Sequence, residues 1–127
     1  MQKWLLIAVG GGFGSLLRYA VHTWVQRASE SVFPWGTLVV NVTACLVVGL
    51  IAGMLAGPQL MRDEYRIGLT VGVLGGYSTF STFGLESFNL AKDEEFALMA
   101  LNMVLSCGLG FFAVWAGYRL AERWFVA

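Results

Sequence analysis

The sequence predicts an all-α membrane protein with four spanning helices, and three observations indicate this class. The chain has 127 residues, of which 57% are hydrophobic and 13% are charged, about half the charged share of a soluble domain. Long stretches contain no charged residue at all: 4–17, 31–61, 67–85 and 96–118. Aromatic side chains gather near the ends of these stretches, as they do at the headgroup level of a bilayer. A buried soluble bundle is the alternative, but such a chain would present no polar face to water.

The four spans follow from the lengths of the uncharged stretches, because about 20 apolar residues cross a bilayer. We expect one transmembrane domain over 1–127, with helices at approximately 4–25, 35–55, 66–88 and 96–120. The first helix would continue past Arg18, and its charged start resembles a secretory leader. No small-residue cleavage site follows, so we expect a retained helix.

The distribution of basic residues bears on orientation. Four spans place both termini and the second linker on one side of the membrane. That side collects five basic residues (Lys3, Arg62, Arg66, Arg119, Arg123) and the other side three (Arg18, Arg27, Lys92). This is a weak bias under the positive-inside rule, so the chain could insert in both orientations. Two opposed copies would form an antiparallel homodimer containing an inverted repeat, as in many transporters.

Glycines recur at four-residue spacing, which is typical of closely packed membrane helices. The rows are Gly49, Gly53 and Gly57; Gly68, Gly72 and Gly76; and the pair Gly10 and Gly14. A nucleotide-binding glycine loop is a poor alternative for the first pair, because no strand precedes it. We expect these glycines to lie where helices meet.

The two cysteines and the single histidine suggest no catalytic or metal site. Cys45 and Cys107 lie in different spans without a CxxC spacing, which favours reduced structural thiols. His22 stands near the end of the first span with no second histidine or carboxylate cluster nearby in the sequence. We expect it to be a structural residue at the membrane interface.

Polar residues inside the spans form three stripes. Thr37 and Asn41 share one face of the second helix, and Asn102 and Ser106 repeat this spacing in the fourth. The third helix contributes a hydroxyl row: Ser78, Thr79, Ser81 and Thr82. Each residue alone is best explained by interhelical hydrogen bonding, which contributes about 0.6–2 kcal/mol. Together the stripes predict a lined path.

The chemistry of this path favours an anion. Apart from Arg66 and Arg119 at span boundaries, the only charged groups inside the spans are Arg18 and Glu86, both near helix ends, so no acid lies deep enough to relay protons or attract a cation. The remaining groups are neutral amide and hydroxyl donors, and donors suit an anion.

Residues 75–86 read GGYSTFSTFGLE, and this stretch carries two further signals. Phe80 and Phe83 are three residues apart and share a helix face, where the positive ring edges could stabilise a small anion. The alternative is that the two phenylalanines simply fill a hydrophobic core. The Gly75–Gly76 pair predicts a helix break, which persists at mid-membrane only inside protein or beside an aqueous cavity. Such a break also frees carbonyls for a cation.

These residues resemble the Fluc (CrcB-type) family of small bacterial fluoride channels. The resemblance rests on GGFGSLLR at Gly11–Arg18, GTLVVN at Gly36–Asn41 and GGYSTFSTFGLE at Gly75–Glu86. The third motif is highly specific, the first is weak alone, and the similarity runs along nearly the whole chain.

The resemblance implies an antiparallel dual-topology homodimer with four helices per subunit and a break in the third. Two fluoride pores would follow the dimer interface, and a structural sodium ion would lie at its centre, held by backbone carbonyls of Gly75 and Ser78 from both subunits. The implied roles of the pore residues are as follows: ring edges from Phe80 and Phe83, a donor from Asn41, polar-track hydroxyls from Thr37, Ser81, Thr82 and Ser106, a vestibule arginine in Arg18, and an acidic residue in Glu86.

The function implied is a passive fluoride-selective channel in the bacterial inner membrane that exports fluoride and reduces its toxicity. Its partners would be fluoride, sodium, lipid and a second copy of the chain, with no nucleic acid and no enzymatic activity. A proton-coupled dual-topology small-molecule exporter is the main alternative, and a structural subunit without transport is another. The chain departs from the family pattern at Tyr77, Ser78, Gly84 and Gly110.

Overall fold

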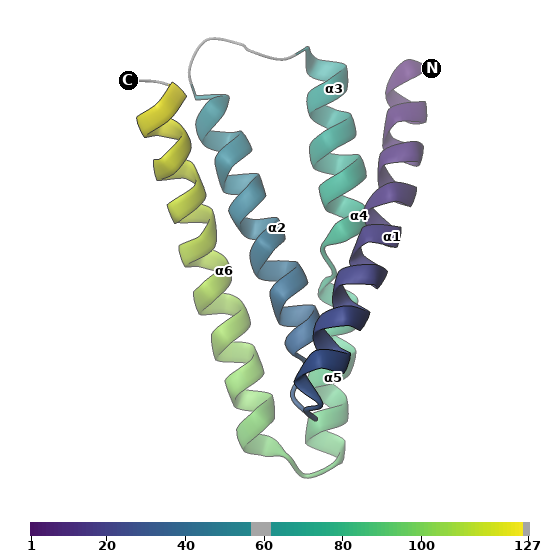
Figure 1. Ribbon diagram of the computed structural model, residues 1–127, viewed down its shortest axis with the longest axis vertical. Helices are drawn as coiled ribbons and strands as arrows, with labels where there is room; N and C mark the ends of the chain where they lie inside the picture. Colours follow the sequence, from purple (N-terminus) through teal and green to yellow (C-terminus); the bar gives the residue numbers. More distant parts are fainter. Residues whose placement is uncertain (57–61, 126–127) are drawn as a thin grey trace.

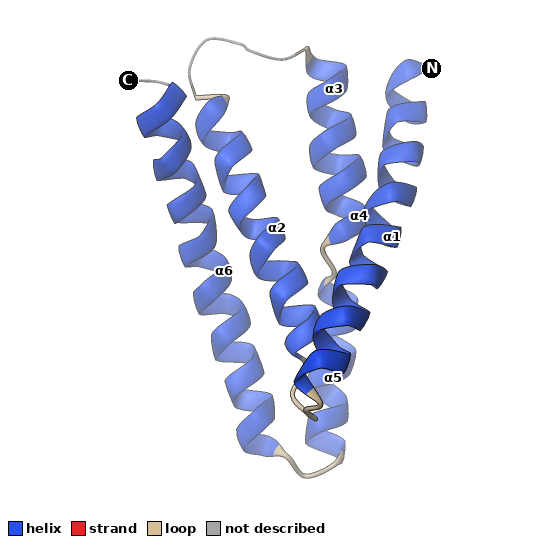
Figure 2. Cartoon of the chain, in the orientation of Figure 1, coloured by secondary structure: helices blue, strands red, loops and turns tan. Residues whose placement is uncertain are grey.

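The computed structural model describes residues 1–56 and 62–125, and within these ranges every regular element is a helix (Figures 1 and 2). Three helices are long: α1 (Gln2–Ser29), α2 (Trp35–Met54) and α6 (Phe96–Phe125). The third expected span is divided into α3 (Asp63–Ile67), η1 (Gly68–Leu74), α4 (Gly75–Tyr77) and α5 (Phe80–Lys92). Gly57, the last member of one glycine row, lies outside the described residues.

The prediction that the chain is an all-α membrane protein is confirmed. Among the described residues, α1, α2 and α6 are each long and apolar enough to cross a bilayer. The third span reaches a similar length only by joining its shorter pieces. The chain is therefore a multi-pass helical membrane protein.

The helices open from one another like a narrow V (Figure 1). The helix α6 runs alongside α2, and α1 crosses the third segment near its centre. The start of α1, the start of α3 and the end of α6 all lie at the same end of the molecule. The pair formed by α2 and α6 meets the other helices chiefly where α1 contacts α2 and where α5 contacts α6.

Glycines lie where these helices meet, as their spacing predicts. A Cβ on Gly14 would overlap the carbonyl of Val73, and one on Gly49 would overlap the carbonyl of Val114. Gly117 faces the backbone of α2 in the same way. A side chain larger than hydrogen would push these backbones apart, so the glycines permit both the α1–η1 and the α2–α6 contacts.

The glycine pair predicted to break the third helix is itself helical, which corrects that expectation. Gly75 has φ −65° and ψ −34°, and α4 continues through Tyr77. The interruption falls at Ser78 (φ −75°, ψ 156°) and Thr79 (φ −150°, ψ 115°), both extended. Gly76 serves a different purpose, because a Cβ there would overlap the carbonyl of Gly11 in α1.

The turn between α1 and α2 is closed by one amide side chain. Gln26 Nε2 donates to the carbonyls of Ser31 (2.8 Å) and Phe33 (3.1 Å), and its Oε1 accepts the N–H of Gly36 (3.0 Å). The helix α1 extends to Ser29, past the expected end near 25, and Gln26 in its last turns holds the following turn closed.

Candidate functional site

The interruption of the third segment is held by Asn41 of α2. Its Nδ2 donates to the carbonyl of Thr79 (3.0 Å), and its Oδ1 accepts the N–H of Thr79 (2.8 Å). Both backbone groups of this extended residue are thus paired with one side chain. A carboxamide carries two N–H donors, so the second hydrogen of Asn41 remains available to an anion.

The helix α5 begins directly after this clamp and is capped by hydroxyls. The N–H of Thr82 donates to Thr79 Oγ1 (3.2 Å), which in turn donates to Thr82 Oγ1 (2.9 Å). Ser81 Oγ lies 3.4 Å from Thr79 Oγ1. A threonine at this position satisfies N–H groups that the first helical turn leaves unpaired. The positive end of the α5 dipole therefore lies beside the interruption.

A cavity of about 250 Å³ lies at the interruption, and we call it the phenylalanine cavity. Its lining joins the interruption and the start of α5 to α2 and α6: Asn41, Cys45, Ser78, Thr79, Phe80, Phe83, Ser106 and Cys107. The ring centroids of Phe80 and Phe83 are 5.5 Å apart, with their planes at 42°. Phe80 is 83% exposed in the single chain, so its ring stands free at the cavity mouth.

A second cavity of about 220 Å³, the arginine cavity, lies on the other side of Thr79. Its lining contains the expected vestibule arginine and two of the expected track hydroxyls: Ser15, Arg18, Tyr19, His22, Thr37, Val40, Thr79 and Thr82. Thr79 lines both cavities. Side chains of α1, α2 and α5 therefore line one cavity at the interruption, the phenyl rings line the other, and Thr79 is common to both.

Glu86 lies beside the arginine cavity and is tied to α2. Its Oε1 accepts the Thr37 hydroxyl (2.8 Å) and lies 3.5 Å from His22 Nε2. The sequence did not reveal this single carboxylate beside His22, since Glu86 is 64 positions later in the sequence but adjacent in space. The buried Thr37 hydroxyl is occupied by this carboxylate.

The polar stripe of α6 divides into two roles. Ser106 reaches the phenylalanine cavity and donates to Asn102 Oδ1 (3.4 Å). Asn102 is buried and donates to Ser87 Oγ (3.0 Å), which joins α6 to α5. Ser87 was not predicted from the sequence, although its place one residue after Glu86 puts another polar group in that span.

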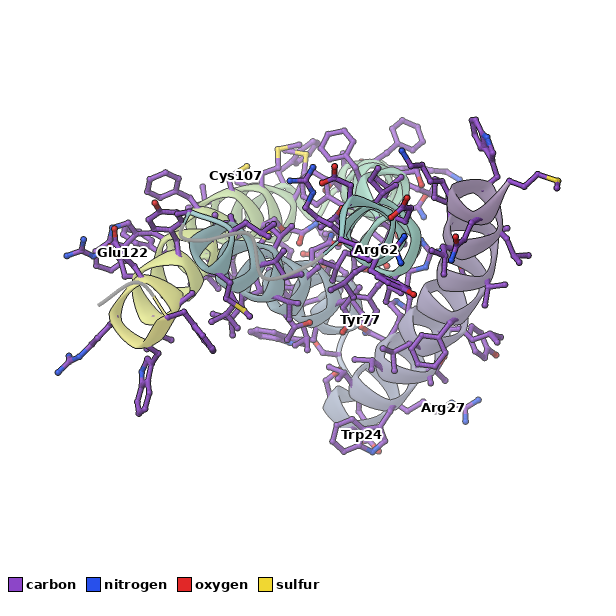
Figure 3. The ribbon with its side chains drawn as sticks, turned by 90° about the horizontal axis from the view of Figure 1, so that it is seen from above. Trp24, Arg27, Arg62, Tyr77, Cys107 and Glu122 are labelled. Atoms are coloured by element: carbon purple, nitrogen blue, oxygen red, sulfur yellow. The ribbon has the colours of Figure 1, made fainter. Side chains whose placement is uncertain are left out.

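The positions that depart from the family pattern have separate explanations. Tyr77 is buried among the helices (Figure 3), packs with Val40 and Ala44, and shares a hydrogen bond of 2.9 Å with Thr43 Oγ1. Gly84 faces open space, because a Cβ at this position would meet nothing within 4 Å. A Cβ on Gly110 would meet only Cys45 Sγ at 3.5 Å.

The interruption leaves the carbonyls of Gly75 and Ser78 without the hydrogen bonds of a continuous helix, which suits them to bind a cation. In a continuous helix they would accept the N–H groups of Thr79 and Thr82. Those two N–H groups instead donate to Asn41 Oδ1 and Thr79 Oγ1. Carbonyl oxygens released in this way are the ligands that unwound membrane helices offer to sodium. Within the described ranges, no cluster of three His, Cys, Asp or Glu side chains could hold a metal ion.

Comparison with known proteins gives matches along nearly the whole chain. A family model described as "CrcB-like protein, Camphor Resistance (CrcB)" matches residues 5–118. A protein of Geobacter sulfurreducens named "Fluoride-specific ion channel FluC" is 43% identical over 123 residues, covering 97% of this chain and 99% of the relative. Proteins with the same name from Solibacter usitatus (42%, covering 96% and 100%) and Rhizobium leguminosarum bv. trifolii (45%, covering 92% and 94%) are similarly close.

Proposed function

This chain belongs to the CrcB family, and from that premise we propose that it forms a passive fluoride-selective channel. Its relatives are named ion channels and match it end to end, so it is a membrane channel and not an enzyme. The observation that carries the proposal is the phenylalanine cavity, where two phenyl rings stand beside amide and hydroxyl groups at the interruption of a helix.

The lining of this cavity suits an anion that has lost its water. Asn41 supplies an N–H donor, the Ser106 hydroxyl would supply an O–H donor on turning from its long bond to Asn102, and the rings of Phe80 and Phe83 supply positive edges. The positive end of α5 adds to the same potential. Fluoride is small and strongly hydrated, so donors at close range must replace its shell. Chloride is larger and a weaker acceptor, and a narrow donor-lined filter disfavours it.

Arg18 would collect the anion on the far side of Thr79. Its guanidinium lines the arginine cavity together with the hydroxyls of Thr37 and Thr82. A cation in a low-dielectric cleft raises the local concentration of anions. Fluoride would pass from this cavity, by way of Thr79 and the hydroxyl of Ser81, to the phenyl rings.

We infer that the working unit is an antiparallel homodimer. The phenylalanine cavity is lined by polar groups yet opens at the surface of the single chain, where Phe80 is exposed. Irregular backbone and polar groups do not face lipid at membrane depth. A second copy covering this face would enclose the cavity, and the weak charge bias permits the opposed orientation.

The dimer would place two copies of Gly75 and Ser78 near its centre, where their carbonyls would bind one sodium ion. The ion would be structural: its charge offsets the carbonyl dipoles that the interruption leaves free. The carbonyls are backbone atoms, so serine at position 78 serves as well as any other residue. This sodium and the placement in the bacterial inner membrane, with fluoride export as the benefit to the cell, are parts of the same proposal.

Fluoride efflux from liposomes tests the function directly. Vesicles loaded with potassium fluoride and reconstituted with purified protein should release fluoride when valinomycin carries the potassium, as followed by a fluoride electrode. We expect no comparable release of chloride. Flux should persist when the pH gradient is collapsed. Dependence on that gradient would favour the proton-coupled exporter, and absence of flux would favour a structural subunit.

Replacement of the rings tests the site within the same assay. We expect Phe80→Ile and Phe83→Ile each to abolish or greatly slow efflux, while the dimer measured by crosslinking stays intact. Phe88→Ile is the matched control, since Phe88 is an exposed ring of α5 that lines none of the cavities described above. Efflux at the unmodified rate from both cavity variants would remove the rings from the mechanism.

A further inference from the structure

His22 and Glu86 form a close pair whose facing atoms are incompletely satisfied. His22 Nε2 lies 3.5 Å from Glu86 Oε1, outside a good hydrogen bond, and it is buried without any other partner. Glu86 Oε2 is also buried and unpartnered. Buried polar atoms are nearly always paired, and a protonated imidazole would meet this carboxylate both as a hydrogen-bond donor and as an opposite charge.

The histidine ring packs directly against the backbone of α2. A Cβ on Gly36 would lie 2.8 Å from His22 Cδ2 and 2.6 Å from the His22 carbonyl. The ring can therefore occupy this place only because residue 36 is glycine. Gln26 Oε1 holds the N–H of the same glycine, which ties the ring, the end of α1 and the start of α2 together.

His22 also stands between two cavities. It lines the arginine cavity, and it lines an outer cavity of about 260 Å³ formed with Glu86, Asn89, Asp93 and residues of the α1–α2 turn. The side chains of His22 and Glu86 are 32% and 22% exposed. Water in the outer cavity can therefore exchange protons with the imidazole, while the opposite side of the pair borders the anion path.

The charged groups around the ring leave Glu86 as its nearest partner. The helix α5 presents Glu86, with Asp93 after its end, and α1 itself presents Arg18 and Tyr19. The helix α2 contributes Gly36 and the uncharged Thr37. Tyr77 of α4 directs its hydroxyl to Thr43 instead. Among the described residues, His22 is the one basic side chain within ion-pair distance of Glu86, so the state of His22 decides whether this carboxylate charge is offset.

We propose that His22 is a proton-sensitive positioning residue for Glu86 and thereby sets the rate of anion passage through the arginine cavity. An unpaired carboxylate beside the path repels an anion, because like charges in a partly dry cleft interact strongly. Protonated imidazole offsets that charge and draws Oε1 towards itself. Histidine is the side chain that changes charge near physiological pH, so flux should rise as the pH falls. This inference rests on the proposed fluoride conduction.

The test is the pH profile of fluoride efflux with equal pH on both sides of the vesicle. Leakage of hydrogen fluoride from protein-free vesicles is subtracted at each pH. We expect efflux through the unmodified channel to rise about fivefold from about pH 8 to about pH 6, a range that brackets histidine titration. His22→Gln should flatten the profile, and His22→Lys should keep efflux high throughout. Arg27→Gln, which removes an exposed charge of α1 away from the cavities, should keep the rise.

A spectroscopic measurement identifies the titrating group. His22 is the single histidine of the chain, so ¹⁵N-histidine labelling gives one imidazole to observe. Its signals should change over the same pH interval as efflux. A rise in efflux that persists in His22→Gln, or that occurs outside that interval, would overturn the inference while leaving fluoride conduction established. Absence of efflux at every pH would overturn the proposed function itself.

Discussion

Removal of the Asn41 side chain gives the sharpest test of how the interruption is held. Asn41→Ala deletes the donor to the Thr79 carbonyl (3.0 Å) and the acceptor for the Thr79 N–H (2.8 Å). Thr79 is 8% exposed, so water cannot readily replace either bond. The N–H and the carbonyl of Thr79 could regain hydrogen-bond partners only if the segment rewound into a continuous helix at this point.

The magnitude follows from two lost partners. An interhelical hydrogen bond in a membrane protein contributes about 0.6 kcal/mol on average, whereas a buried polar group left unpaired costs about 1–3 kcal/mol. Both groups belong to a buried backbone, so the second figure applies to each, and we expect a loss of about 2–6 kcal/mol in the free energy of unfolding. Fluoride efflux should fall as well, because the clamp also supplies a donor to the cavity.

The assay is reversible unfolding in bicelles, followed by the fluorescence of the five tryptophans. Asn102→Ala is the matched control: it makes the same chemical change, but both partners of Asn102 are rotatable hydroxyls, those of Ser87 and Ser106, so we expect a loss nearer 1 kcal/mol. The reasoning fails if Asn41→Ala unfolds within about 0.5 kcal/mol of the unmodified protein, which is the range of neutral surface changes.

Three further outcomes can be checked with the same two assays. Gly14→Ala should destabilise the fold by about 1–3 kcal/mol or more, because its methyl meets the Val73 backbone, whereas Gly12→Ala should be nearly neutral since nothing lies within 4 Å; equal effects would contradict the close contact of α1 with η1. Tyr77→Phe should cost about 1 kcal/mol of unfolding free energy through loss of the 2.9 Å bond to Thr43, and no change would place that hydroxyl outside the buried network. A small thiol reagent should slow efflux by filling the phenylalanine cavity beside Cys107, which is exposed, and Cys107→Ala should resist it; equal inhibition of both proteins would assign the effect elsewhere.

The class of the protein could be predicted because uncharged length is a local property of the sequence. The length of each uncharged stretch indicates how many residues can lie within the bilayer, and reading that length requires no knowledge of the fold. The polar stripes were equally readable, since Thr37 and Asn41 follow helical spacing. What they bond to was not readable, because each partner comes from another helix.

The position of the helix interruption shows this limit clearly. Glycine is a poor helix former, so local propensity pointed to Gly75 and Gly76. The fold uses Gly76 for its small size against α1, and a helix is held there by packing. The extended residues are Ser78 and Thr79, and Asn41, the partner of Thr79, lies 38 positions earlier. Only the approach of α2 to the third segment makes that exchange of hydrogen bonds possible.

The His22–Glu86 pair could not be predicted, for the same reason. Near the histidine in the sequence there is no acid that a local motif could use. The pair forms because α1 and α5 pack about α2, with Gly36 admitting the ring. A contact of this kind is a product of tertiary structure alone.

The division of the third segment also bears on how the chain enters the bilayer during synthesis. The helix α5 has 13 residues and is about 20 Å long, too short to traverse the hydrocarbon by itself. A translocon releasing this segment would meet polar, unwound backbone at its middle. We therefore expect the third segment to leave the translocon only together with the first helix, whose glycine-lined side contacts it. If this pairing fails during biogenesis, the nascent chain would be left with three spans across the membrane.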